Sequence, residues 1–388
     1  MIEVEKFIPG GQTLGRLEDG KKIFFWNALP GEEVIDYDIT KVKSHYAEAI
    51  ATNIGNPSPF RTNPKDQCYL STSPWQIVDY GHELSVKQEL VVEVFREHGI
   101  IIDSPEIATD FKDYHYRNKM EYALYWNNET KAIELAFHRR GSHRKIPITR
   151  SSIERPEILI AATTIVRRLN EAHEEARSYQ SILLRCSQDG NVSGGLYKNH
   201  EPHPVFPNLS DTILGYQYTY SPNGFFQINV PVYEMALQTI KQHINTDKVL
   251  DLYSGVGTIG LSVARDRILT LVECDKFAYG ELQNNIDQIS NHHHISAILA
   301  KSEDVVSYIE PDQTVILDPP RAGCDSRVIN KLNEQKPHTI IYLSCNPATQ
   351  ARDVRLLLDN YEIETVKTFN FFPHTPHIEN LLVRKRIV

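Results

Sequence analysis

The sequence contains few cysteines and shows no pairing pattern among them. Its 388 residues hold five, scattered along the chain: Cys68, Cys186, Cys274, Cys324 and Cys345. This usage excludes a disulfide-stabilised scaffold and is typical of a protein from a reducing compartment. Cys345 in particular can remain a free thiol.

Long apolar runs are absent as well. No stretch approaches the roughly 20 residues of a membrane span, and residues 1–6 lack the basic-then-apolar order of a signal peptide. We therefore expect a cytoplasmic protein with no membrane partner. At 388 residues the chain exceeds the usual size of one core, so two or three domains are expected.

The chain also lacks a net positive charge. Its formal net charge of -9 weakly disfavours nucleic acid as a partner. The exception is residues 115–150, where arginine and lysine outnumber glutamate and aromatic residues are interleaved. This segment predicts an RNA-facing patch with rings on which unpaired bases could stack, although taken alone it would better suit a solvated β-hairpin.

The patterns that are present divide the chain into four segments. Residues 1–56 alternate apolar and polar between glycine-rich turns, which predicts a small closed β-barrel. Residues 57–98 hold a proline-rich connection and then, from residue 83, helical periodicity. Residues 99–217 mix strand patterns with one helix, Pro156–Arg177, as in an α+β domain. In residues 218–388 helices and strands alternate, which predicts an α/β fold with a doubly wound, mainly parallel sheet.

The individual elements of the two larger segments follow from the same periodicities. Strands are predicted at Lys119–Trp126, Ala132–His138, Ser181–Arg185, Val249–Tyr253, Ile268–Glu273, Ile295–Leu299, Thr314–Leu317 and Thr339–Leu343. Besides the helix in the α+β segment, helices are predicted to begin at Pro231, Thr258, Phe277 and Pro347.

Four stretches of the α/β segment carry residues suited to chemistry. Lys248–Gly260 (KVLDLYSGVGTIG) and Val315–Gly323 (VILDPPRAG) are apolar runs that stop at an acidic residue and a turn. Ile340–Gln350 (IIYLSCNPATQ) presents Cys345 in an abrupt turn, and Phe371–Asn380 (FFPHTPHIEN) follows it. Because parallel strands deliver side chains to one crevice, we expect these stretches to converge on one site.

The glycine pattern indicates a nucleotide-like ligand. Gly255–Gly260 satisfies G-x-G-x-x-G between a strand and a helix, and Glu273 ends the next strand, where it can accept bonds from ribose hydroxyls. The pattern serves NAD enzymes and S-adenosylmethionine-dependent methyltransferases alike, and a tight turn with a surface glutamate would also produce it. Asp318–Arg321 (DPPR) favours the methyl donor, since its prolines stiffen the loop and hold the acid at the cleft.

Taken together and in this order, DLYSGVG, DPPRAG, SCNP and HIEN resemble the RNA uridine-5-methyltransferase family of the RumA/TrmA type. Residues 1–55 are similar to the family's TRAM barrel, an OB-like RNA-binding module. Phe137–His143 resembles the central domain, and Phe225–Glu379 resembles the Rossmann-like class I methyltransferase domain. The resemblance implies methyl transfer from S-adenosylmethionine to carbon 5 of a uridine, in ribosomal RNA, with 23S as first candidate, or in transfer RNA.

The resemblance also assigns roles to individual residues. Cys345 would be the nucleophile and Glu379 the base. Contacts with the methyl donor are expected from Gln227, Tyr253, Gly255, Gly257, Thr258, Glu273 and Asp318. Independently of the resemblance, contacts with RNA are expected from Arg139 and Arg140 in the basic segment and from Arg321, which could polarise a uracil carbonyl.

The proposed nucleophile and base have a physical rationale. Carbon 5 of uracil is a poor nucleophile, but a thiolate that adds to carbon 6 creates an enolate whose carbon 5 can attack the sulfonium methyl. A carboxylate then takes the proton from carbon 5, and the thiol is eliminated. Because the thiol must be partly ionised, we expect positive charge near Cys345, from Arg321 or from the helix N-terminus at Pro347.

Several alternatives stay open. The chain could be an RNA cytosine-5-methyltransferase, or an idle RNA-binding or chaperone protein of the same fold. Cys324 follows Asp318 at the wrong spacing for the cytosine enzymes, so we interpret it as structural. The run His292–His294 suits a solvated loop better than a metal site. His374 and His377 either position the base, shuttle protons, bind metal or pack the turn.

One departure from the family stands out. Many relatives hold an iron–sulfur cluster through several cysteines, whereas the corresponding segments here supply only Cys68 and, later, Ser151-Ser152. One cysteine cannot hold such a cluster, so we expect no iron–sulfur centre and no other metal. Recognition by three domains on one chain requires only a monomer.

Overall fold

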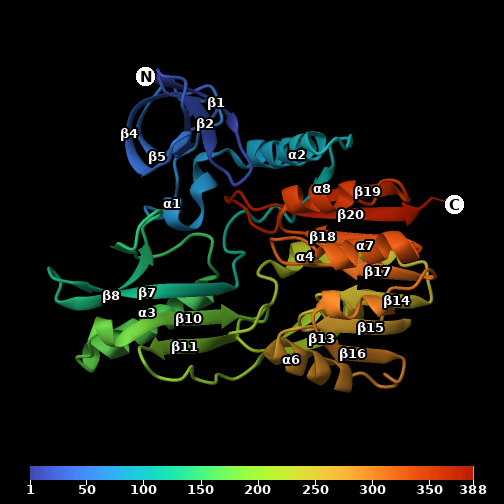
Figure 1. Ribbon diagram of the computed structural model, residues 1–388. Helices are drawn as coiled ribbons and strands as arrows, with labels where there is room; N and C mark the ends of the chain where they lie inside the picture. Colours follow the sequence, from blue (N-terminus) through green and yellow to red (C-terminus); the bar gives the residue numbers. More distant parts are fainter. Residues whose placement is uncertain (388) are drawn as a thin grey trace.

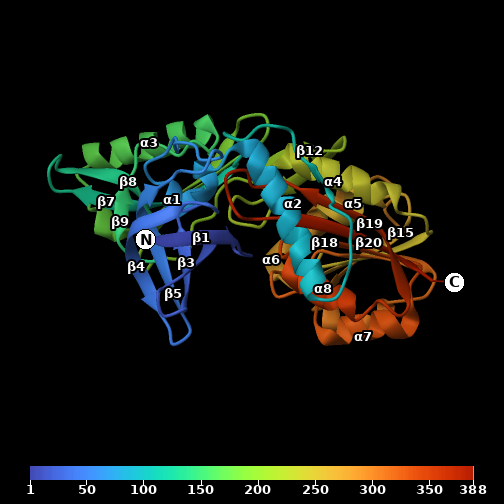
Figure 2. The same ribbon diagram turned by 90° about the horizontal axis from the view of Figure 1, so that it is seen from above.

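The computed structural model describes residues 1–387 and has three units. An N-terminal barrel and a central sheet both lie beside a larger α/β unit (Figure 1). Helix α2 (Tyr80–Glu97) leaves the barrel and runs across the α/β unit (Figure 2). No helix among these residues is long and apolar enough to cross a bilayer.

The N-terminal barrel is closed, with strand order β1-β2-β3-β5-β4. Its strands are β1 Ile2–Phe7, β2 Thr13–Arg16, β3 Lys22–Trp26, β4 Glu33–Val42 and β5 Tyr46–Gly55. Alternating residues such as Ile23, Phe25 and Ala49 fill the interior, as the period of two requires. The barrel predicted for residues 1–56 is confirmed.

The central unit is a five-stranded antiparallel sheet covered by one helix. Its strand order is β11-β10-β7-β8-β9. The elements are β7 Lys119–Asn127, β8 Ala132–His138, β9 Lys145–Pro147, α3 Pro156–Glu171, β10 Tyr179–Cys186 and β11 Val192–Lys198. The predicted helix end at Arg177 is wrong. Left-handed His173 (φ 53°) stops the helix, and the Glu174 N–H donates to the Leu169 carbonyl in a C-terminal cap.

The α/β unit is built on an eight-stranded sheet of order β16-β15-β14-β17-β18-β20-β19-β6. Its strands are β6 Glu106–Ala108, β14 Lys248–Leu252, β15 Ile268–Glu273, β16 Ile295–Leu299, β17 Gln313–Leu317, β18 Thr339–Ser344, β19 Tyr361–Phe369 and β20 Glu379–Arg386. The strands from β16 to β18 run parallel, and β20 is antiparallel to β18. The predicted α/β fold class is confirmed, and each predicted strand of this unit is present within one residue.

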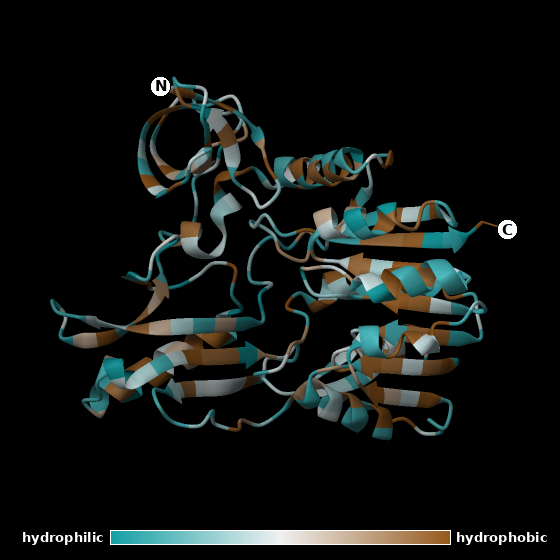
Figure 3. Ribbon diagram, viewed as in Figure 1, coloured by the Kyte–Doolittle hydropathy of each residue, from teal (hydrophilic) through white to brown (hydrophobic). Residues whose placement is uncertain are grey.

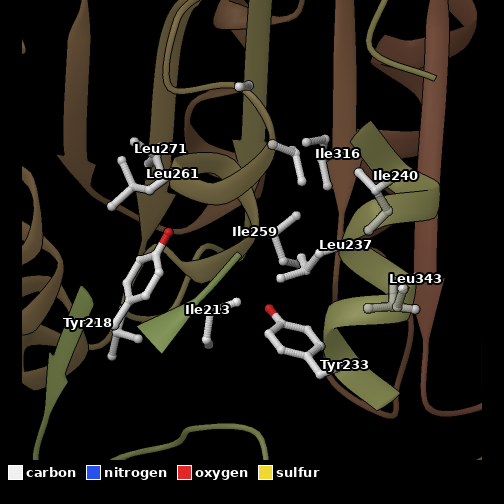
Figure 4. Packing of buried hydrophobic residues seen from close by; sticks show 14 of the residues in the cluster. Ile213, Tyr218, Tyr233, Leu237, Ile240, Ile259, Leu261, Leu271, Ile316 and Leu343 are labelled. Carbon is white, nitrogen blue, oxygen red and sulfur yellow. The ribbon is translucent and has the colours of Figure 1, made fainter. Parts of the chain in front are cut away.

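Helices cover both faces of this sheet and create two cores (Figure 3). We call them the α4 core and the α2 core. The first is formed with α4 Val230–Gln242, α5 Thr258–Val263 and α6 Lys276–Asp287, and the second with α2, α7 Ser326–Gln335 and α8 Pro347–Arg355. Figure 4 shows Tyr233 and Leu237 of α4 packed near Ile259 of α5 and Ile316 of the sheet.

The α/β unit takes in segments that the sequence analysis assigns elsewhere. Strand β6 lies within residues 99–217, yet it pairs with β19 at the edge of the eight-stranded sheet. The hairpin of β12 (Leu209–Ile213) and β13 (Tyr216–Tyr220) contributes to the α4 core. Helix α2, predicted as part of a linker, buries its apolar stripe in the α2 core. These contacts join residues distant in sequence, so periodicity alone could not predict them.

Candidate active site

One face of the sheet gathers the chemistry-bearing residues at its carboxyl edge. In β18 Ile341 and Leu343 belong to the α4 core, whereas Ile340 and Tyr342 belong to the α2 core. Side chains alternate between the two faces of a strand. When the same alternation is followed along each strand, one set of side chains lies on the α4 side of the sheet: Asp251, Glu273, Asp318, Cys345 and Glu379. Strand β20 runs antiparallel to the other strands. Its first residue, Glu379, therefore lies at the same edge of the sheet as the last residues of the parallel strands.

Cys345 and Glu379 are neighbours across two strands. The β18–β20 ladder ends with Ser344 opposite Asn380, and Cys345 and Glu379 follow one step further out. Opposed side chains of an antiparallel pair have Cβ atoms about 4.5–5.5 Å apart and point to the same face. Glu379 is 6% exposed and Cys345 is half-buried. A thiol accessible from solvent therefore stands beside a buried carboxyl group.

The electrostatic surroundings of Cys345 combine carboxyl groups with one arginine. Burial, Glu379 and Asp318 raise the pKa of its thiol to about 11, and Arg321 only partly opposes them. Burial and Asp318 also raise the pKa of Glu379 well above its ordinary value. Burial alone raises the pKa of Asp318 to about 7. In the protein by itself the thiol is therefore protonated near neutral pH. Arg321 supplies the positive charge predicted near Cys345, and partial ionisation during the reaction stays a prediction.

The glycine loop after β14, residues 255–257, borders a space that a ligand could occupy, which we call the cradle. A Cβ built on Gly255 (φ 56°) would meet no atom within 4 Å, so this residue borders open space. A Cβ on Gly257 (φ 88°) would lie 2.5 Å from Leu282 Cδ1, so glycine is needed for close packing. Glu273 fixes the loop, since its carboxylate accepts from the Gly255 N–H at 2.8 Å and from the Asp275 N–H at 2.7 Å.

The other predicted donor contacts lie around this loop. Thr258 begins α5, and its hydroxyl is 2.8 Å from that of Tyr233, which links α5 to α4. Gln227 lies in the loop between β13 and α4, and its carbonyl accepts from Asn118 Nδ2 at 3.0 Å. Tyr253 has a left-handed backbone (φ 65°) and its ring packs against the α2 core, away from the α4 side.

Arg321 joins the strand-end loops and contacts a histidine. Its carbonyl accepts from Asn346 Nδ2 at 2.9 Å and from the Thr349 hydroxyl at 3.3 Å. Its guanidinium is 3.0 Å from His377 Nδ1. Burial and Arg321 lower the pKa of His377 to about 4. The imidazole is therefore neutral at physiological pH and accepts a hydrogen bond from the exposed arginine.

His374 is held in place by hydrogen bonds to other parts of the protein. It is buried with a left-handed backbone (φ 59°), and its N–H donates to both oxygens of Glu83 at 3.1 and 2.9 Å. Its Nε2 lies 3.2 Å from Asp113 Oδ2. Among residues 1–387 no group of three histidine, cysteine or acidic side chains is arranged to hold a metal ion.

Arg139 and Arg140 lie at the junction with the barrel. The Arg140 guanidinium lies 4.1 Å from the centroid of the Trp26 ring and also donates to the Leu70 carbonyl. Arg139 is 3.5 Å from Asp38 on β4. Both arginines therefore connect the central unit to the barrel in this structure, and a role in RNA contact stays a prediction.

Comparison with known proteins identifies the class of this fold and site. The tRNA (Uracil-5-)-methyltransferase model matches residues 209–387, and the TRAM domain model matches residues 1–52. The part of the chain that matches the methyltransferase model includes Asp318, Cys345 and Glu379. The matched region begins at β12, in agreement with the packing of the β12–β13 hairpin into the α4 core.

Proteins similar to this chain match it over nearly their whole length. A protein of Prochlorococcus marinus named as an RNA methyltransferase is 28% identical, with 92% of this chain and 99% of the relative covered. One from Enterococcus faecalis is 26% identical over 100% of this chain and 98% of its own. The chain is an RNA methyltransferase, and its residues 209–387 resemble the tRNA (uracil-5-)-methyltransferase family.

A solved structure shares the fold of the whole chain. It is the Pyrococcus abyssi tRNA (uracil-54, C5)-methyltransferase in complex with S-adenosyl-L-homocysteine, with a TM-score of 0.77 and 23% identity. The match covers 99% of this chain and 100% of that one. The arrangement of barrel, central unit and methyltransferase unit is therefore a recurrent architecture.

Sequence reasoning missed residues that act through distant contacts. Asp251 is fully buried, and its Oδ2 accepts from the Gly260 N–H at 2.8 Å, which holds the start of α5 to β14. Burial raises the pKa of Asp251 to about 8. Its position at the end of an apolar run was visible in the sequence. By contrast, Asn118 and Glu83 carry no local signal, because their partners lie more than 100 residues away.

Proposed function

We propose that this enzyme methylates carbon 5 of a uridine in structured RNA through a transient bond between Cys345 Sγ and carbon 6 of the base. One observation carries the proposal: the half-buried thiol and the buried Glu379 carboxyl group stand opposite each other on adjacent strands. They face the same side of the sheet as Asp318 and Glu273. A nucleophile and a base for the same ring need this proximity.

The proposed reaction balances as follows. Cys345 first releases its proton to solvent, the thiolate then bonds to carbon 6, and the electron pair of the 5,6 double bond moves into the enolate. Carbon 5 then bonds to the methyl group as its bond to the donor sulfur breaks, and S-adenosylhomocysteine is released. Glu379, in its carboxylate form, takes the proton from carbon 5, and elimination breaks the Cys345–carbon 6 bond, which restores the ring and releases Cys345 as a thiolate.

The charges around Cys345 suit a thiol that is protected until substrate binds. Its pKa is raised to about 11 by burial and by two neighbouring carboxyl groups. S-Adenosylmethionine supplies an electrophilic methyl group on a cationic sulfonium. Arg321 is the protein's own nearby cation, and its charge favours both the thiolate and an enolate oxygen.

The residues present fit the methyl donor. Open space in front of Gly255 leaves room for a ligand against the backbone, and Glu273 is fixed beside it. We assign donor contacts to the glycine loop, Glu273, Asp318, Thr258 and Gln227. The adjacent carboxyl groups favour a cationic ligand over a neutral one.

The RNA target is a uridine in ribosomal RNA, with 23S as first candidate, or in transfer RNA. The barrel and the central unit supply an RNA-binding surface, and folded RNA would present its base flipped out of the stack. The structural neighbour with the same three units acts on transfer RNA. Mass-spectrometric mapping of 5-methyluridine in both RNA classes, from cells with and without this protein, identifies the target.

We also propose that no iron–sulfur cluster is held. Cys68 Sγ lies 3.9 Å from the Arg150 carbonyl, and the neighbouring Asp66 carboxylate accepts from the Ser152 N–H and hydroxyl at 2.8 and 2.6 Å. These polar side chains satisfy one another without an inorganic group. Iron and sulfide assays on anaerobically purified protein should give substoichiometric values, whereas stoichiometric iron would overturn the assignment.

Methyl transfer to defined RNA tests the reaction. With radiolabelled S-adenosylmethionine, uridine RNA should gain methyl groups and the matching cytidine RNA should not. Cys345→Ala and Glu379→Gln should each lose about 100-fold or more in turnover. Glu362→Gln alters an exposed residue outside the site and should retain turnover. Methylation of the cytidine RNA would favour the cytosine-5 enzyme, and no transfer with either would favour an idle RNA-binding protein.

A further inference from the structure

The loop that carries Gln227 is held from outside the methyltransferase unit. We call residues 221–229, between β13 and α4, the donor loop. Lys119 Nζ, at the start of β7 in the central unit, donates to the carbonyls of Asn223 and Gly224, both at 3.1 Å. A single cation thus holds two neighbouring carbonyl groups of the loop.

Two further residues of the central unit also donate hydrogen bonds to the donor loop. Arg185 Nη2 on β10 donates to the Phe226 carbonyl at 3.2 Å. Asn118 donates through Nδ2 to the Gln227 carbonyl at 3.0 Å and through its N–H to the Ile228 carbonyl at 3.3 Å. Carbonyl groups along most of the donor loop therefore accept from one neighbouring unit, whereas the Phe225 side chain is 72% exposed.

Burying the guanidinium of Arg185 costs free energy unless other groups stabilise its charge. This side chain is only 1% exposed, and its Nε and Nη1 have no hydrogen-bond partner among the described residues. Burial lowers the pKa of its guanidinium to about 10. A buried cation needs compensation. Besides the charges of Asp211 and Glu281, it comes from the Phe226 carbonyl and the Tyr220 ring, 5.5 Å away. Both belong to the donor loop or the strand that leads into it.

The methyltransferase unit holds the donor loop at both ends and through Phe226, which packs in the α4 core. At the far end Asn229 Nδ2 donates to the Phe371 carbonyl at 3.2 Å. Glu281 on α6 accepts from the Ser221 N–H at 2.5 Å, and Asn285 accepts from the Thr219 N–H at 2.9 Å. Asn285 also donates to the Val256 carbonyl of the glycine loop at 3.0 Å. The donor loop therefore connects the methyl-donor cradle on one side with the central unit on the other.

We propose that Lys119 and Arg185 are positioning residues for methyl-donor binding, which fix the donor loop from the central unit. Affinity for S-adenosylmethionine then depends on an RNA-binding unit that does not itself contain the cradle. The inference rests on the proposed function, which assigns Gln227 to the methyl donor. It predicts that RNA contacts on the central unit and methyl-donor binding are coupled through this loop.

Protonation of Lys119 gives the proposal a distinctive signature. Burial and the charges of Arg185 and Arg117 lower its pKa to about 8, while Glu121 and Glu281 oppose them. As pH rises through 8 the ammonium loses its charge, so its hydrogen bonds to the loop carbonyls weaken. Arginine at this position would stay charged over the same range.

Calorimetric titration of the full chain with S-adenosylhomocysteine, without RNA, tests the inference. Lys119→Met and Lys119→Gln should each raise Kd on the order of tenfold at pH 7, the effect expected for a lost charged hydrogen bond. Lys119→Arg should restore most of the affinity. Lys112→Met, at an exposed lysine in the segment that leads into the central unit, is the matched control and should bind like wild type. Wild-type Kd should rise more steeply between pH 7 and 9 than that of Lys119→Arg, in which only groups such as Asp318 and Asp251 still titrate over this range.

Two outcomes separate this inference from the proposed function. If Gln227→Ala weakens binding but folded Lys119→Met and Lys119→Gln bind like wild type, the positioning role is overturned and the cradle assignment stands. If wild type does not bind S-adenosylhomocysteine, or Gln227→Ala has no effect, the assignment of the donor loop itself fails. A wild-type pH profile no steeper than that of Lys119→Arg, together with unchanged Lys119 variants, also overturns the positioning role.

Discussion

At the scale of single residues, environment decides what each group can do. Cys345 and Cys274 are the cysteines with access to solvent, and Cys68, Cys186 and Cys324 are buried. Accessibility alone does not make a thiol reactive, because the thiolate is the nucleophile. Carboxyl groups beside Cys345 disfavour that form, so its reactivity in the protein alone should be low.

The raised pKa of Cys345 predicts a steep pH dependence of its alkylation. In a Cys274→Ser background, iodoacetamide labelling of Cys345 should be slow at pH 7 and increase about tenfold per pH unit toward pH 9, since its pKa is about 11. Mass spectrometry of the Cys345 peptide gives the rate. Fast labelling that does not change between pH 6 and 9 would show a depressed pKa and contradict this electrostatic account.

At the scale of elements, strand ends and helix starts could be predicted and their partners could not. The runs around Asp251, Asp318 and Cys345 revealed their strands because a buried parallel strand is apolar and ends in a turn. Strand β6 has three residues and forms only against β19, so no local pattern marks it. The donor-loop contacts of Lys119 and Arg185 were likewise invisible, because they join different units.

Close packing of the glycine loop predicts a contrast between two glycines. Gly257→Ala should lower stability by roughly 2 kcal/mol and weaken methyl-donor binding, because φ is 88° and the new Cβ would lie 2.5 Å from Leu282 Cδ1. Gly280→Ala, inside α6 with open space around it, should instead be neutral or stabilise by about 0.5–1 kcal/mol. Urea denaturation compares the two, and equal effects would contradict the packing argument.

A buried ion pair on α2 supports the loop that carries the proposed base. Glu83 and Lys87 are 2.8 Å apart and fully buried, and Lys87 Nζ also donates to Asn370 Oδ1 at 2.7 Å and the Phe372 carbonyl at 3.1 Å. Lys87→Met should destabilise by about 3–5 kcal/mol, because it leaves Glu83 charged and unpaired. The double variant Glu83→Gln/Lys87→Met should lose less. Thermal denaturation compares the stability of the two variants. A double variant that is less stable than Lys87→Met would refute the role of the unpaired charge.

At the scale of the whole molecule, residues 370–377 form a junction of all three units. The His374 carbonyl accepts from the Trp75 N–H at 3.0 Å, and the Trp75 indole donates to the Gly11 carbonyl of the barrel at 2.9 Å. From the central unit, the Tyr116 hydroxyl donates to the Pro373 carbonyl at 2.9 Å. The FFPHTPHIEN pattern indicated a site but gave no sign of this junction, since each partner lies far away in sequence.

The barrel's contact with this junction predicts a second contrast. Gly10 and Gly11 have nearly equal φ, 95° and 93°, but a Cβ on Gly11 would lie 2.1 Å from Pro376 Cβ whereas one on Gly10 meets nothing within 4 Å. Backbone strain is therefore matched between the two alanine variants. Gly11→Ala should lower the rate of RNA methylation more than Gly10→Ala, with S-adenosylhomocysteine binding unchanged in both. Equal methylation rates would show that the barrel's position does not matter.

The covalent bond between enzyme and base is the central claim, and RNA that contains 5-fluorouridine tests it directly. Fluorine cannot leave carbon 5 as a proton does, so the adduct should persist through denaturing electrophoresis. In the presence of S-adenosylmethionine we expect wild-type protein to form this adduct, with the linkage at Cys345 by peptide mass spectrometry, and Cys345→Ser to form none. A persistent adduct in Cys345→Ser, or methylation of ordinary uridine RNA without any adduct on the fluorinated RNA, would contradict the account.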